Sequence, residues 1–289
     1  MAFDLENPLP STPSLFHTEY DHMPSQNYSQ SLKAADLEVS LRHETVSLIL
    51  QYCSSRFHPF ISYLAVNYLD RFLSAHAISN LQGGQTWMAS LLAVSCVSLA
   101  LKMREEEVLV TDIQNDGRFI FDVETIRRME ILILGALRWR MRSITPFCFV
   151  NFFLSLFNLK DPPLLQALKA RATEIIFKAQ YDIKLLEFQP SLVAASALLS
   201  ASHELFPLQF PRFKKAVSNC PYVNKEKLFG CWNAMQEIVM EGYESVLEAA
   251  SSSSTPASIL DLRCSSESSS SDLDGEKNNE RGIKRRKII

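Results

Sequence analysis

The sequence predicts an all-α protein built from two consecutive helical sets. Three observations favour this class: apolar residues recur at spacings of three and four, only 8 of the 289 residues are glycine, and only 10% are aromatic. Those spacings are typical of amphipathic helices, whereas sandwiches and barrels need many turns. With 47% hydrophobic residues, the chain can bury one large core or two moderate ones. Its net charge of -3 gives no overall attraction to nucleic acid or to a membrane surface.

Both ends of the chain have compositions typical of flexible segments. Residues 1–30 combine scattered Pro, Ser, Asn and His without helical periodicity, so we expect a mobile arm. Residues 251–289 are rich in serine and acidic residues, which cannot offset the entropy of ordering, so we expect a disordered tail. A basic cluster ends this tail, of the kind that nuclear import receptors or polyanions bind: Lys284, Arg285, Arg286 and Lys287.

The first helical set is expected over residues 31–142. Four long segments have helical periodicity, 36–56, 59–75, 83–103 and 122–139, and a shorter helix is expected near VTDIQN at 110–115. Asp122 is the expected N-cap of the fourth long segment, because a short carboxylate there can accept a bond from a first-turn amide.

The second helical set is expected over residues 143–250. Its predicted helices cover 146–158, 163–182, 190–205 and 223–250. Three of them have proline near the start, where the missing N–H is harmless: Pro146, Pro163 and Pro190. Because the two sets are similar in length and in helix number, we expect a structural repeat.

The six cysteines lie far apart, with no C-x-x-C and no histidine at metal-ligand spacing. They indicate small buried side chains in a reducing compartment. The most apolar stretch, residues 88–103, falls short of a membrane span and is expected to be a core helix. The N-terminus lacks the basic start and apolar run of a secretion signal.

Local catalytic motifs are missing from the sequence. It contains no G-x-G-x-x-G, no G-x-x-x-x-G-K-[ST], no H-E-x-x-H and no G-x-S-x-G. A lone histidine such as His203 is more typical of a polar group at a helix end than of a catalytic base. We therefore expect a binding protein without metal or cofactor. An all-α enzyme whose site is assembled from distant residues is the alternative.

The stretch YLAVNYLDRFLS, residues 63–74, is a helix that carries a charged pair although most of its surface is apolar. Its strongly polar residues fall on one narrow stripe: Asn67, Asp70, Arg71 and Ser74. Adjacent residues on a helix do not face each other, so Asp70 and Arg71 each need a partner elsewhere. Arg71 is expected at the domain surface, with its stem along the apolar face.

Several stretches resemble, in order and spacing, the cyclin box of D-type cyclins. They are RHETVSLILQ (42–51), YLAVNYLDRFLS, LLAVSCVSLALKMREEEV (91–108), TIRRMEILILGALRWRM (125–141) and ITPFCFVNFF (144–153). With LLEFQPSLVAASALL (185–199), the resemblance covers about residues 32–247 and is most similar to the plant D-type group. It implies two tandem five-helix cyclin folds, the first of which packs against a protein kinase.

The resemblance also implies a function. Cyclins bind a cyclin-dependent kinase, turn its αC helix inward so that a Lys–Glu pair can form, and free its activation loop. The chain is thus expected to be a non-catalytic kinase activator that controls cell division at the G1/S transition, in the nucleus and the cytoplasm. The alternative within the same fold is a transcription-factor-like scaffold that binds DNA or other proteins, which would need a basic face on its folded part.

Individual residues can be carried over from the family's box. Arg42 and Asp70 match a basic residue and an aspartate that are expected to form an internal ion pair. Lys102 and Glu130 match the family's kinase-contacting lysine and glutamate, and Leu91 matches a position that is either core or interface. From the residues alone, Lys102 reads as a cation that complements a helix C-terminus, and Glu130 reads as an i,i+3 partner of Arg127.

The sequence also departs from the family's pattern. The N-terminal arm lacks the L-x-C-x-E stretch that docks on retinoblastoma-related proteins, and LRCSSE at 262–267 has one residue too many. Direct docking on retinoblastoma-related proteins is therefore not expected, as in the short plant D-type subgroup. Leu48 stands where the family has a tryptophan, so the groove that Leu41 and Leu48 would line is expected to hold substrates and kinase inhibitors weakly. Thr12 and Thr255, each followed by proline, are candidate sites for proline-directed kinases.

Overall fold

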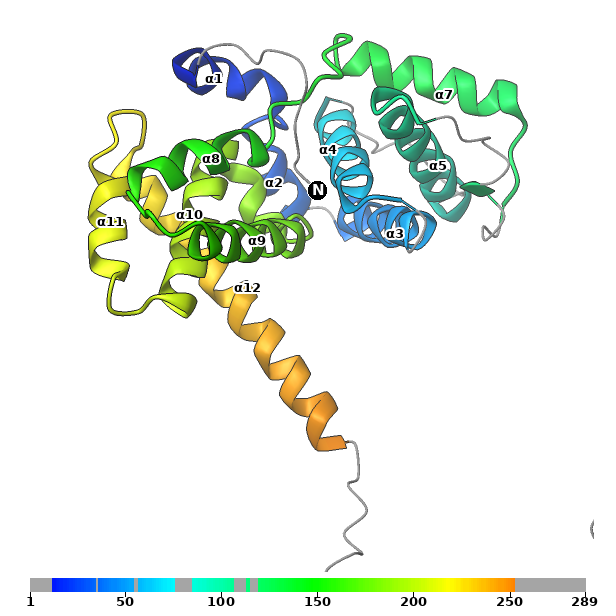
Figure 1. Cartoon of the computed structure of the whole chain (residues 1–289). Helices are drawn as coiled ribbons and strands as arrows, with labels where there is room; N and C mark the ends of the chain where they lie inside the picture. Colours follow the sequence, from blue (N-terminus) through cyan, green and yellow to red (C-terminus); the bar gives the residue numbers. More distant parts are fainter. Residues whose placement is uncertain are drawn as a thin grey trace, which may run out of the picture. The chain divides into compact units, whose positions relative to one another are not determined.

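The computed structural model describes residues 12–34, 36–54, 57–75, 85–106, 113–114 and 119–252. Within these ranges every regular element is a helix, which confirms the all-α prediction (Figure 1). The described residues up to Ser245 belong to one compact unit. This unit contains two hydrophobic cores, one in each helical set.

The first set consists of α3 (Asp36–Cys53), α4 (Pro59–Ala75), α5 (Gln85–Met103) and α7 (Val123–Ala136). Helix α5 packs against the other three, and all its residues from 89 to 101 are buried. It is long and apolar enough to cross a membrane, but its burial is that of the expected core helix. Asp122 caps α7, because its carboxylate accepts the Thr125 amide at 2.8 Å. The helix expected at 110–115 falls mostly outside the described residues.

The second set consists of α8 (Phe147–Leu156), α9 (Pro162–Ala179), η2 (Ile183–Glu187), α10 (Pro190–Leu205), α11 (Phe210–Ser218) and α12 (Lys225–Ser252). Helix α10 is its central element, buried at every residue from 190 to 202. It therefore has the place in this set that α5 has in the first. The sequence prediction missed α11, which is only nine residues long and holds a proline in its first turn.

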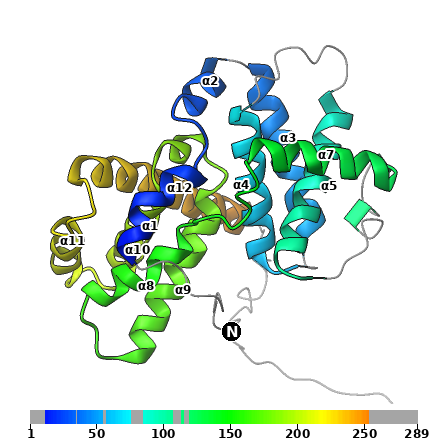
Figure 2. The same cartoon turned by 90° about the horizontal axis from the view of Figure 1, so that it is seen from above.

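The expected flexible arm is wrong for residues 12–30, which form α1 (Thr12–Thr18), η1 (Glu19–His22) and the start of α2 (Tyr28–Ala34). Figure 2 shows α1 over the second set and α2 beside α3. The Phe16 ring stacks on Tyr222 with 4.6 Å between centroids, and Tyr28 is buried in the first core. A few large apolar side chains thus anchor a segment whose Pro- and Ser-rich composition conceals them.

Of the six cysteines, the described ones are free, and four of them are buried: Cys53, Cys96, Cys220 and Cys231. Burial raises the pKa of the Cys53 thiol to about 12, which keeps it protonated and unreactive. Cys148 is partly exposed, and Cys264 lies outside the described residues. The described thiols are therefore packing residues.

Glu19 fixes the N-terminal segment to the start of the central helix of the second set. Its carboxylate accepts the Ser191 amide and the Ser191 hydroxyl, both at 2.8 Å, in the first turn of α10. Burial raises the pKa of Glu19 to about 7, against the opposing effect of these two bonds. Glu19 of η1 thus caps the N-terminus of α10, although its side chain is almost completely buried.

Glu19→Gln is expected to flatten the pH dependence of stability between pH 4.5 and pH 7. A raised folded-state pKa means that the contribution of Glu19 is fully present below its unfolded value and is lost as pH rises through about 7. Across this window the free energy of unfolding of the wild type is expected to fall by about 2–3 kcal/mol more than that of the variant. Urea unfolding of both proteins at pH 5 and pH 8 measures the difference. An equal change in the free energy of unfolding between the two pH values in both proteins would contradict the assigned pKa. His22, whose pKa is lowered to about 4 mainly by burial, has the opposite dependence and cancels in the comparison.

Candidate functional site

Arg42 and Asp70 are joined in a buried, bidentate ion pair between α3 and α4. Arg42 Nε donates to Asp70 Oδ1 at 2.7 Å, and Nη2 donates to Oδ2 at 3.1 Å. The Tyr28 hydroxyl donates to the same carboxylate at 3.2 Å. Burial alone lowers the pKa of Arg42, but the Asp70 carboxylate outweighs it and the net shift is upward. The pair implied by the family resemblance is therefore present, with a tyrosine partner that the sequence did not indicate.

Arg42 also reaches the second helical set. Its Nη1 donates to the Tyr181 carbonyl at 3.0 Å, and its Nη2 donates to the Gln180 carbonyl at 3.3 Å. These carbonyls follow the end of α9, where backbone acceptors lack partners within the helix and a cation is favoured. One guanidinium thus ties α3, α4 and the end of α9 together.

Arg71 is buried, so its expected position at the domain surface is wrong. Its guanidinium donates to the Arg140 and Leu137 carbonyls at 3.0 and 3.4 Å, and to the Ser143 hydroxyl at 3.1 Å. The two carbonyls belong to the segment where α7 ends in a left-handed turn, with φ of 52° at Arg138, and there the helix no longer supplies all their partners. Burial lowers the pKa of Arg71 to about 10, which leaves it charged at neutral pH.

Lys102 and Glu130 lie together where α5 ends and α7 passes. The Lys102 ammonium donates to Glu130 Oε1 at 2.7 Å and to Oε2 at 2.6 Å. The Ser98 hydroxyl, one turn earlier on α5, donates to Oε1 at 2.6 Å. The Lys102 side chain is 58% exposed and that of Glu130 is 9% exposed. The alternative pairing of Glu130 with Arg127 is therefore wrong, whereas Lys102 does occupy the last turn of its helix.

Three apolar residues of α5, α7 and the turn after α7 are partly exposed on the same helical set. Met103 follows Lys102 and is 38% exposed, and Ile131 follows Glu130 and is 51% exposed. Trp139 is 70% exposed, and its amide donates to the Leu134 carbonyl at 2.9 Å, which places the tryptophan just beyond the end of α7. Exposed apolar side chains on a fold that also presents an ion pair are typical of a protein-binding surface.

Three further residues assigned from the resemblance lie in or against the first core. Leu91 is only 4% exposed and belongs to the first core, the first of the two readings of this position; its contact with a kinase stays a prediction. Leu41 is 3% exposed, so it belongs to the core and not to an open groove. Leu48 is partly buried against the same core. Both leucines face inward because the apolar stripe of α3 packs on α5.

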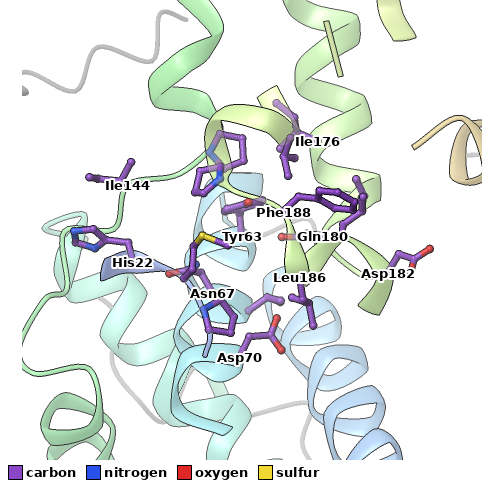
Figure 3. A pocket seen from close by; sticks show the side chains of 18 residues that line it. His22, Tyr63, Asn67, Asp70, Ile144, Ile176, Gln180, Asp182, Leu186 and Phe188 are labelled. Atoms are coloured by element: carbon purple, nitrogen blue, oxygen red, sulfur yellow. The ribbon is translucent and has the colours of Figure 1, made fainter. Parts of the chain in front are cut away.

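A cavity of about 80 Å³ lies between the helical sets (Figure 3). Tyr63, Asn67 and Asp70 line it from α4, and Gln180, Leu186 and Phe188 line it from the region of η2, with His22 at one side. Sites for small molecules usually enclose about 300–1,000 Å³, so this cavity does not fit a substrate. Among the described residues, no cluster of three His, Cys, Asp or Glu could hold a metal ion.

The remaining assigned residues lie at the ends of the chain. Thr12 is the first residue of α1. Thr255 and the basic cluster at 284–287 lie outside the described residues, as does LRCSSE at 262–267. Their assigned roles stay predictions.

Family models match both helical sets. The cyclin N-terminal domain matches residues 12–142, and the cyclin C-terminal domain matches residues 144–258. The first match includes residues 12–30, in agreement with their packed position. The expected tandem pair of cyclin folds is therefore confirmed.

Relatives and solved structures support this assignment. The chain is 46% identical to the Arabidopsis thaliana protein named cyclin-D6-1, over 88% of this chain and 82% of that protein. It is 38% identical to cyclin-D6-1 of Oryza sativa subsp. japonica, over 98% and 89% of the two chains. A viral cyclin from herpesvirus saimiri superposes with a TM-score of 0.54 at 19% identity, over 69% of this chain and 86% of that one. A chain in the CAK complex of Chaetomium thermophilum superposes with a TM-score of 0.53 at 18% identity, over 80% and 75%. The chain belongs to the cyclin family, within its D-type group.

Proposed function

We propose that this protein is the regulatory subunit of a cyclin-dependent kinase and that it activates its partner to control cell division at the G1/S transition. Relatives that carry the D-type cyclin name support the assignment. The observation that carries it is the Lys102–Glu130 pair on the first cyclin fold, which also exposes the apolar side chains of Met103, Ile131 and Trp139. The protein itself performs no catalysis; it supplies a binding surface to a serine/threonine kinase.

The mechanism is a shift of the kinase between two states. An active kinase needs its αC helix turned inward and its activation loop released. Moving that equilibrium from mostly inactive to mostly active takes on the order of 5 kcal/mol of differential binding. Apolar contacts from Met103, Ile131 and Trp139 contribute buried area, and the charged pair contributes orientation.

Lys102 and Glu130 offer opposite hydrogen-bonding capacities to the partner's main chain. The ammonium is more than half exposed and can turn to a backbone carbonyl, whereas the carboxylate can accept backbone N–H groups. Charge-assisted bonds of this kind are shorter and stronger than neutral ones. Both groups therefore fix the register of the kinase segment that binds this face of the fold.

Two features of a D-type cyclin are proposed to be weak or missing. The sequence has no L-x-C-x-E stretch, so the protein does not dock directly on retinoblastoma-related proteins through this motif. Leu41 is buried, and Leu48 replaces an aromatic anchor, so substrates and kinase inhibitors bind the docking groove weakly. Substrate choice then depends mainly on the kinase.

The basic cluster at 284–287 is proposed to direct the protein to the nucleus, with a cytoplasmic fraction before import. Replacing the four basic residues by alanine in a fluorescent fusion is expected to shift the protein to the cytoplasm. An unchanged nuclear signal would contradict this assignment.

Reconstitution with kinases tests the proposed function. The full chain is mixed with each member of a panel of purified cyclin-dependent kinases, and phosphate transfer to a histone substrate is measured. At least one kinase is expected to gain activity in proportion to the complex formed, while the protein alone transfers no phosphate. Failure to bind and activate every member of the panel would overturn the proposal.

A DNA-binding scaffold is the second candidate, and one observation favours it. The stretch from 125 to 142 holds five arginines and one acidic residue, in a chain of net charge -3. Two of these arginines, however, are paired with acids: Arg128 with Glu124 and Arg140 with Asp21. Arg71, which lies outside this stretch, is directed inward. DNA binding that weakens steeply with salt would support this candidate.

A further inference from the structure

Ser98 gives the two oxygens of the Glu130 carboxylate different surroundings. Oε1 accepts two bonds, from the Ser98 hydroxyl at 2.6 Å and from the Lys102 ammonium at 2.7 Å. Oε2 accepts one bond, from Lys102 at 2.6 Å. If the ammonium turns away, Oε1 keeps a donor and Oε2 becomes free. The carboxylate therefore has one anchored oxygen and one available oxygen.

The two donors differ in mobility although they lie on the same face of α5. Ser98 and Lys102 are four residues apart, which brings both side chains opposite Glu130 on α7. Ser98 is 3% exposed and has a single side-chain torsion, whereas the Lys102 side chain is 58% exposed and ends a flexible stem. Of the two groups that donate to Glu130, Ser98 is thus the fixed one and Lys102 the mobile one.

We propose that Ser98 is a positioning residue for kinase binding: its hydroxyl holds Oε1 of Glu130 and so presents Oε2 to a main-chain N–H of the kinase. The inference rests on the proposed function and deepens it. While Lys102 turns to a carbonyl of the partner, the serine keeps the carboxylate in place. The site is therefore a triad from two helices, of which the buried serine never touches the partner.

Without the hydroxyl, the buried carboxylate keeps only the ammonium as a donor. Lys102 is then held by Glu130 more strongly, because releasing it leaves a buried anion without a partner. Both groups become less available to the kinase. A serine that merely linked α5 to α7 would affect the stability of the fold but not the availability of Lys102 and Glu130 to the kinase. Measuring kinase binding and stability in parallel therefore distinguishes a positioning role from a structural one.

Ser98→Ala and Ser95→Ala form a matched pair of variants. Ser95 lies one turn earlier on α5, is fully buried, and its hydroxyl has no hydrogen-bond partner. Affinity for a kinase that the wild-type chain activates is measured by calorimetry, and thermal unfolding is measured in parallel. Ser98→Ala is expected to weaken kinase binding about tenfold, the size of one lost hydrogen bond to a charged group. Ser95→Ala is expected to bind like the wild type.

Three further variants make the test specific. Ser98→Thr keeps a hydroxyl and is expected to restore most of the affinity, whereas Ser98→Cys keeps the volume with a poor donor and is expected to bind as weakly as Ser98→Ala. In a Glu130→Ala background, Ser98→Ala is expected to have no further effect on binding.

The outcomes separate the inference from the proposed function. Equal kinase affinity of Ser98→Ala and Ser95→Ala, or an undiminished effect of Ser98→Ala in the Glu130→Ala background, would overturn the role of Ser98 alone. A wild-type chain that binds no kinase would overturn both the role and the proposed function. If Ser98→Ala lowered thermal stability without weakening kinase binding, Ser98 would only link α5 to α7 and the inference would be overturned.

Discussion

Arg42→Ala is expected to lower the free energy of unfolding by about 3–5 kcal/mol, because it leaves the Asp70 carboxylate buried without its cation. Both side chains of the pair are only 4% exposed, so water cannot replace the lost partner. The Gln180 and Tyr181 carbonyls lose their donor in the same step. Urea unfolding followed by circular dichroism measures the change.

Two comparisons make this result specific. Arg128→Ala breaks the exposed pair with Glu124, whose side chains are 75% and 58% exposed, and is expected to cost less than about 1 kcal/mol. Asp70→Ala combined with Arg42→Ala is expected to cost less than the sum of the single changes, because no uncompensated charge remains. Additive losses would show that the two side chains do not act as a pair.

Lys102→Glu combined with Glu130→Lys is expected to abolish kinase activation, with at least about a 100-fold loss of affinity, while the protein stays folded. The exchanged side chains can pair again with each other, and the Ser98 hydroxyl can accept a bond from the new ammonium. The partner, however, meets a carboxylate where it needs a donor and an ammonium where it needs an acceptor. Kinase assays and circular dichroism of the same preparation measure both effects.

The matched control is a charge exchange elsewhere on α7. Glu124→Arg combined with Arg128→Glu reverses an exposed i,i+4 pair and leaves the Lys102–Glu130 pair intact. This variant is expected to activate the kinase like the wild type. Full activation by the Lys102/Glu130 exchange would place the kinase-binding surface elsewhere on the first cyclin fold.

Periodicity predicted the helices that bury a stripe or a whole surface. Helices α4 and α10 begin and end where the pattern places them, because their apolar residues and starting prolines are local signals. Helix α7 has its expected cap at Asp122 but stops at Ala136, three residues before the predicted end. The left-handed turn at Arg138 and Trp139 breaks it there, and neither residue type announces such a turn.

Contacts between distant elements could not be read from the same pattern. The partners of Arg71 include two backbone carbonyls about seventy residues away, in the segment that ends α7. Glu130 has Arg127 at helical spacing on its own helix, yet its bonds go to α5. The family resemblance placed Lys102 and Glu130 in one site, whereas Ser98 and Tyr28 entered only with the structure.

The helices at residues 12–34 have a consequence for the lifetime of the protein. Phe16 covers aromatic rings of the second cyclin fold, and Leu32 fills part of the first. A protease cut that released these residues would expose hydrophobic surface on both folds at once. Chaperones and degradation enzymes recognise such surface, so one cleavage near the N-terminus would remove the whole molecule from the cell.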